Sequence, residues 1–167
     1  MSSELKDLAE PGARELLRCA EPLRLAYLGI DGLPRVIPIG FLWKDERLFV
    51  CTATSAPKVA ALRKCPNVAV TIDTGNTSAT AKQLLIRGVA AIEIVEGVAP
   101  EYLEAAAKTL GDADLEEFEA QVQTVFERQA RISIVPEWAR FYDFGAGRLP
   151  PFLRGLVEDG QDRTGTA

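Results

Sequence analysis

A strand, turn, strand and helix follow one another near the middle of the sequence, and this order constrains the fold most. Residues 35–43 and 48–51 are apolar runs typical of β-strands, and residues 44–47 form the polar turn between them. A hydroxyl-rich segment, residues 52–55, then precedes a helix that begins near Lys58. Hydroxyl groups, free backbone N–H groups, the helix dipole and a lysine charge would meet at this helix start and could hold an anion such as a phosphate.

A second interpretation of the same segment is purely structural. Thr54 or Ser55 would cap the helix, Pro57 would occupy its first turn, and Lys58 would be solvated. Both interpretations remain open at this point.

Length and charge predict one domain that does not bind nucleic acid. The chain has 167 residues and is 47% hydrophobic, which is enough for one core. We expect a single domain over residues 1–153 and a disordered tail over 154–167, which is polar and glycine-rich. The net charge of −5 argues against a duplex partner. No apolar run approaches the roughly 20 residues of a membrane span, and no signal-peptide pattern is seen, so we expect a cytoplasmic location.

Cysteine and histidine usage narrows the chemistry. Cys19, Cys51 and Cys65 are widely spaced without a C-x-x-C pair, which predicts reduced, mostly buried thiols. The chain has no histidine, so Ser-His-Asp or Cys-His catalysis and histidine-based metal sites are excluded. We expect no metal site and no catalytic side chain, and an enzyme of this kind would depend on a bound cofactor.

The first half of the chain predicts a helix and a β-hairpin. Residues 11–19 form a short amphipathic helix, and residues 23–30 form the first strand. Asp31 and Gly32 predict a type I′ hairpin turn, and residues 35–43 then form its antiparallel partner. Pro38 cannot donate to a sheet ladder, so it indicates an edge, a bulge or a backbone that faces a ligand.

The second half predicts longer strands around a pair of helices. Strands are expected over residues 68–72, 83–95 and 130–135, with a possible continuation over 140–144, and helices over 100–110 and 114–127. Gly88 predicts a bend or bulge. The chain lacks the glycine motifs of dinucleotide-binding and P-loop proteins, and parallel folds need helices between most strands. We therefore predict a mainly β (α+β) fold, a six-stranded antiparallel split β-barrel with a short helix after strand 3 and a helical pair before the last strand.

Several of these segments together resemble a known family. The runs 31–43, 55–58, 66–68, 85–89 and 131–138 are similar to the FMN-binding split β-barrel proteins of the pyridoxamine 5′-phosphate oxidase-like superfamily, most of all to small oxidoreductase-like members of actinobacteria. The resemblance covers about residues 12–153 and does not specify a substrate. It implies a homodimer with cofactor sites between the subunits.

The resemblance also implies which residues bind the cofactor. Arg35 and Lys58 would grip its phosphate. Hydroxyl or backbone contacts would come from Thr52, Thr54 and Ser55. The backbone of the strand segment Val36, Ile37, Pro38 and Ile39 would face the isoalloxazine ring, and Arg87 and Trp138 would contribute across the subunit boundary.

The resemblance implies an FMN-dependent oxidoreductase that transfers hydride or electrons to or from a small molecule. One alternative is a reductase that uses the deazaflavin coenzyme F-420, and another is a flavin-binding protein for storage or sensing without turnover. A barrel that has lost its ligand is a further possibility. Pro57 stands where many relatives have a second basic residue, and the C-terminal arginine and histidine of true pyridoxamine phosphate oxidases are missing, so vitamin B6 phosphate is not the expected substrate.

Overall fold

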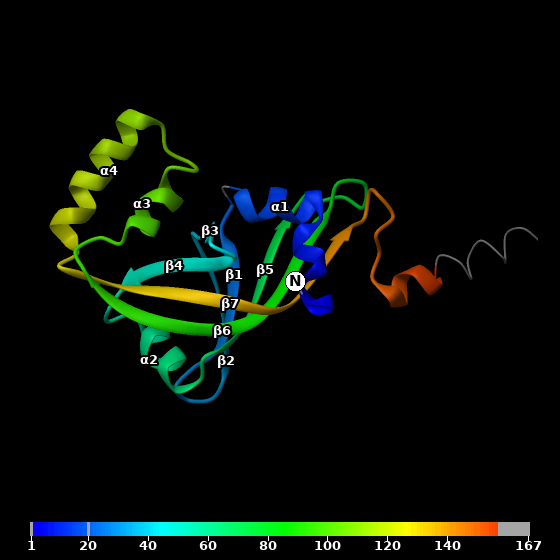
Figure 1. Cartoon of the computed structure of the whole chain (residues 1–167), viewed down its shortest axis with the longest axis horizontal. Helices are drawn as coiled ribbons and strands as arrows, with labels where there is room; N and C mark the ends of the chain where they lie inside the picture. Colours follow the sequence, from blue (N-terminus) through cyan, green and yellow to red (C-terminus); the bar gives the residue numbers. More distant parts are fainter. Residues whose placement is uncertain (1, 20, 157–167) are drawn as a thin grey trace, which may run out of the picture.

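Seven antiparallel strands form one curled sheet (Figure 1). The computed structural model describes residues 2–19 and 21–156. The order across the sheet is β2-β1-β5-β6-β7-β4-β3, so β2 and β3 are its two edges. The strands are β1 (Leu23–Leu28), β2 (Pro34–Ile39), β3 (Leu42–Lys44), β4 (Arg47–Ala53), β5 (Asn67–Thr74), β6 (Lys82–Glu96) and β7 (Arg128–Asp143). The predicted mainly β architecture is confirmed.

Helices lie around the ends of this sheet (Figure 1). They are the 3-10 helix η1 (Ser3–Ala9), α1 (Pro11–Arg18), α2 (Pro57–Lys64), α3 (Pro100–Ala106) and α4 (Asp112–Val125). The predicted helix after residue 11 and the predicted helical pair are confirmed, whereas η1 was not predicted. Residues 151–156 form a further helical turn, and the part of the predicted tail from 157 onward lies outside the described residues. Within the described chain, no helix is both long and apolar enough to cross a bilayer.

The prediction of six strands is wrong, because the stretch 35–43 forms two strands with different neighbours. Its first part, β2, pairs with β1 up to Ile39, and its second part, β3, pairs with β4 from Leu42. Between them, Phe41 turns into the core and is only 1% exposed. The burial of this ring interrupts the strand, so the predicted helix after strand 3 follows the fourth strand instead.

The predicted hairpin between β1 and β2 is present, but its turn type is wrong. A type I′ turn needs a positive φ at both Asp31 and Gly32, but of these two residues only Gly32 has one, 77°. The N–H of Gly32 donates to the carbonyl of Gly29. The Asp31 carboxylate accepts a hydrogen bond from the N–H of Leu33, a local bond that fixes the loop without a positive φ at Asp31. The pair of positive φ angles occurs at Asp45 and Glu46, 50° and 57°, in the two-residue turn between β3 and β4.

The core fills the inside of the curled sheet with alternate side chains. In β5, Val68, Val70 and Ile72 are buried while their neighbours are more exposed, which confirms the strand predicted over residues 68–72. Leu16 and Leu17 of α1 are each 2% exposed and join the same core, so this helix closes one end of the barrel.

The two longest strands, β6 and β7, bend together at one bulge. The register of their pairing shifts between Arg87 and Gly88, and Gly88 lies opposite Pro136. A side chain at Gly88 would overlap the carbonyl oxygen of Val135. The bend predicted at Gly88 is confirmed, and the close approach of the two backbones requires glycine there.

We expect Gly88→Ala to lower the free energy of unfolding by about 2 kcal/mol, because the added methyl group has no space against the β7 backbone. Gly155→Ala is a matched control, since nothing lies within 4 Å of a Cβ at that position. Urea unfolding followed by circular dichroism measures both. Equal midpoints for the two variants would contradict the packing argument.

Candidate functional site

No side chain caps the start of α2, so the hydroxyl groups of the preceding residues are not used for capping. Ala56 is the N-cap residue and Pro57 occupies the first helical position. Thr54 and Ser55 lie before the cap, so the capping interpretation is wrong for both, whereas its placement of Pro57 is correct. Their side chains remain available to a bound molecule at the end of β4.

Lys58 lies in the first turn of α2 and is half-buried rather than solvated. Its ammonium group donates to the hydroxyl of Thr52 at 3.3 Å. It makes no ion pair with any described residue, and burial lowers the pKa of Lys58 below its usual value of 10.5. Partial burial of a cation without a carboxylate partner has an electrostatic cost that an anion would relieve.

Arg35 lies near the same helix start but already has an acidic partner. It lines a cavity of about 330 Å³ together with Tyr27, Pro57 and Ala61. Its guanidinium donates to Asp31 at 2.5 Å. Two hydrogen bonds hold the pKa of Asp31 below its usual value. The larger effect comes from the N–H of Leu33 and the smaller one from the side chain of Arg35. The structure thus brings Arg35 to α2, with part of its charge neutralised.

The edge strand β2 offers backbone hydrogen-bonding groups only at alternate residues. The carbonyl of Leu33 accepts from Gly29 N–H at 2.9 Å, so Leu33 faces β1. Because bonded and non-bonded pairs alternate along an antiparallel ladder, Ile37 and Ile39 also face β1, while Val36 directs its N–H and C=O outward. Pro38 faces the same open edge but has no N–H. Of the predicted ring-facing segment, Val36 offers both a donor and an acceptor.

Arg87 and Trp138 form a separate group. They are cross-strand partners on β6 and β7, and the guanidinium carbon of Arg87 lies 4.3 Å from the centre of the indole ring. They line a cavity of about 470 Å³ with Asn67 and Glu137. None of the cofactor contacts predicted on α2 and β2 lines this cavity, so the described chain does not join the two groups.

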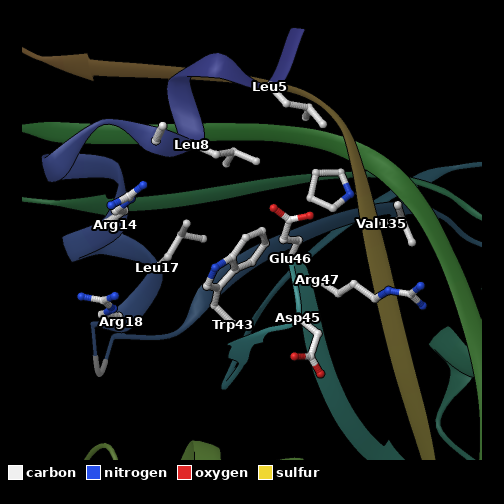
Figure 2. A pocket seen from close by; sticks show the side chains of 12 residues that line it. Leu5, Leu8, Arg14, Leu17, Arg18, Trp43, Asp45, Glu46, Arg47 and Val135 are labelled. Atoms are coloured by element: carbon white, nitrogen blue, oxygen red, sulfur yellow. The ribbon is translucent and has the colours of Figure 1, made fainter. Parts of the chain in front are cut away.

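Another cavity, about 520 Å³, was missed by the sequence analysis and lies elsewhere (Figure 2). Its apolar floor includes Leu8, Leu17 and Trp43, and Glu46 points in from the β3–β4 turn. None of the predicted site residues lines it. It was missed because η1 was not predicted; the spacing of three between Leu5 and Leu8 was the available signal.

A family model described as pyridoxamine 5′-phosphate oxidase matches residues 9–143. The chain belongs to this family. No curated protein sequence matches it. The predicted resemblance is therefore confirmed at the level of the family, over the region that contains every residue of the predicted site.

Solved structures share this family's split barrel. The conserved hypothetical protein Rv2991 from Mycobacterium tuberculosis is 24% identical with a TM-score of 0.64, and the match covers 89% of this chain and 94% of that one. An F420 reductase is 21% identical with a TM-score of 0.55, covering 79% and 98%. HutZ, a heme storage protein from Vibrio cholerae, is 21% identical with a TM-score of 0.57, covering 78% and 92%. At these identities the likeness shows the fold alone.

A fourth cavity in this protein, about 260 Å³, lies between α3 and the bend that joins β2 to β3. Its lining includes Glu101 and Lys108, neither of which the sequence analysis singled out, and also Cys51. Their signal in the sequence is weak, because charged residues in an amphipathic helix are usually solvated.

We expect Cys51 to resist alkylation in the folded protein. Burial, with a smaller contribution from Glu101, raises the pKa of Cys51 to about 12, so the reactive thiolate is scarce near neutral pH. Iodoacetamide at pH 8 should modify the less buried Cys65 and leave Cys51 unmodified until urea unfolds the chain. Peptide mass spectrometry distinguishes the sites, and equal rates at both cysteines before unfolding would contradict this expectation.

Proposed function

We propose that the protein is a homodimeric oxidoreductase that binds FMN at the start of α2 and acts on a small molecule. The observation that carries this proposal is the half-buried Lys58 ammonium, which donates to Thr52 and has no described carboxylate partner. It stands beside the uncapped segment with Thr54 and Ser55 and close to the cavity of Arg35. These groups fit a phosphate monoester.

Each group has a definite task in this arrangement. Lys58 and Thr52 would hold the cofactor phosphate, with Thr54 and Ser55 adding hydroxyl contacts. Arg35 would share its charge between Asp31 and the phosphate. Val36 would meet the polar edge of the ring with its N–H and C=O, while FMN, when bound, supplies the hydride or electron transfer.

The exposed apolar side chains of the β1–β2 hairpin support a homodimer. Leu28, Ile30, Leu33 and Val36 are 42% to 64% exposed, and all lie on or beside this hairpin. Such a patch is typical of a protein interface. A second subunit there would cover these side chains, and we propose that Arg87 and Trp138 serve the cofactor from that subunit.

Coenzyme F-420 is the second candidate cofactor, because it also carries a phosphate and the fold is shared with a protein named as an F420 reductase. Flavin binding without turnover is the third, and the shared fold of a heme storage protein supports it. We also retain the predicted cytoplasmic location, without a nucleic acid or membrane partner.

The proposal is tested by fluorescence titration with FMN and with riboflavin, which lacks the phosphate. We expect wild-type protein to prefer FMN, and Lys58→Met to weaken FMN binding about tenfold or more while leaving riboflavin binding unchanged, because a charged hydrogen bond is lost. Lys64→Met is the matched control on the same helix, since Lys64 only donates to the carbonyl of Ile30.

Parallel titrations with coenzyme F-420 decide between the cofactors. Binding of neither cofactor, or equal FMN affinity in both lysine variants, would overturn the proposed site. Reduction of the bound cofactor by NADPH and reoxidation by an added acceptor separate an enzyme from a storage protein.

The lowered pKa of Lys58 predicts that FMN affinity depends on pH. In the free protein, burial favours the neutral amine, whereas a bound phosphate favours the ammonium, so binding takes up a proton. FMN affinity should therefore fall as pH rises through the lowered pKa of Lys58 toward 10.5, and this fall should vanish in Lys58→Met. Titrations at a series of pH values between 7 and 10 measure it.

A further inference from the structure

The cavity of about 260 Å³ beneath α3 is lined by four aromatic side chains together with smaller apolar and polar residues. Phe41 and Phe49 come from the sheet side, and Tyr102 and Phe118 come from α3 and α4. The rings of Tyr102 and Phe118 lie 5.7 Å apart, centre to centre. The size and the walls suit a single aromatic ring with small substituents.

Glu101 lines this cavity, and one of its carboxylate oxygens has no hydrogen-bond partner among the described residues. Its side chain is 9% exposed, and Oε1 accepts from the guanidinium of Arg131 at 2.9 Å. Oε2 is buried and accepts no hydrogen bond from any residue that the structure describes. A buried carboxylate oxygen without a donor is costly, so an N–H group of a ligand would be stabilising there.

Lys108, in contrast, lacks a hydrogen-bond acceptor. Its Nζ is also buried, and it donates to no described residue, Glu101 included. It lies 3.8 Å from the ring centre of Phe41, a cation–π contact that offsets part of the desolvation. Desolvation also lowers the pKa of Lys108. An anionic or carbonyl oxygen would give this ammonium the acceptor that it lacks.

We propose that this cavity binds a small aromatic molecule whose N–H donor meets Glu101 and whose carboxylate or carbonyl oxygen meets Lys108. One carboxylate oxygen of Glu101 and the Lys108 ammonium are buried without a hydrogen-bond partner among the described residues, and a ligand with both polar functions would satisfy them. Ile39 and Gly40 also line the cavity, at the end of the strand β2. The further inference that this ligand is the substrate rests on the proposed function, in which β2 faces the flavin ring.

The test uses the full flavin-free chain and three probes, 4-aminobenzoate, benzoate and aniline, in isothermal titration calorimetry. The first probe has both polar groups, and each of the others lacks one. We expect 4-aminobenzoate to bind about tenfold or more tightly than either of the others. Lys108→Met should abolish its advantage over aniline, and Glu101→Gln its advantage over benzoate.

Glu104→Gln is the matched control, because Glu104 lies on α3 but is exposed and pairs with Lys44. It should bind all three probes as wild type does. Circular dichroism checks folding, and if Glu101→Gln does not fold, Lys108→Met alone decides. Equal binding of the three probes, no saturable binding, or unchanged selectivity in Lys108→Met would overturn the proposal.

Titration of the same samples with FMN separates this inference from the proposed function. If FMN binds and no probe does, the aromatic site is wrong and the cofactor site stands. If 4-aminobenzoate binds selectively and FMN does not, the aromatic site stands and its role as the substrate pocket is wrong. If both bind, the probe should also shift the visible absorbance of the flavin.

Discussion

The pairing of β6 with β7 supports the rest of the molecule. The two strands pair from Lys82 with Asp143 to Glu96 with Arg128, and each also pairs with a strand of a different half of the sheet, β5 and β4. A regular ladder of this length twists gradually, and the bulge at Gly88 adds a local bend. The two halves can then curl around one core, and their edges β2 and β3 are joined by the short segment at Gly40 and Phe41.

This arrangement explains why candidate sites gather where the halves meet. Because β4 and β5 lie on opposite sides of the β6–β7 pair, α2 must cross from one half to the other. Its start carries Lys58 and approaches the edge strand β2, which has backbone groups without a ladder partner. The insertion of α3 and α4 between β6 and β7 covers the bend at Phe41. Topology thus places a cationic helix start and an aromatic cavity at the two ends of one short edge strand.

Local patterns in the sequence predicted most elements because they depend on nearest neighbours. The alternation of Val68, Val70 and Ile72 and the glycine at position 88 both indicate features that the backbone imposes locally. The split of the stretch 35–43 could not be predicted in this way, since it depends on Phe41 finding a place in a core built by distant strands. Lys58 could be identified from its position at the start of a helix. The pairing of Arg35 with Asp31, four residues away, depends on the hairpin turn type, which was predicted wrongly.

The half-buried Lys58 and the buried ammonium of Lys108 differ in how visible they are from the sequence. Lys58 has a hydroxyl partner and follows a polar segment, and both features support the proposed anion site. Lys108 looks like an ordinary surface residue in the sequence, and only the fold shows that its charge is desolvated beside Phe41. Carboxylates are ordinarily solvated at the surface, yet Glu101 is buried with one oxygen unpartnered among the described residues. A buried polar group without a partner destabilises the fold, and it persists only where the surrounding packing holds it in place. A ligand that supplies the missing hydrogen bond would convert this unfavourable free energy into binding affinity.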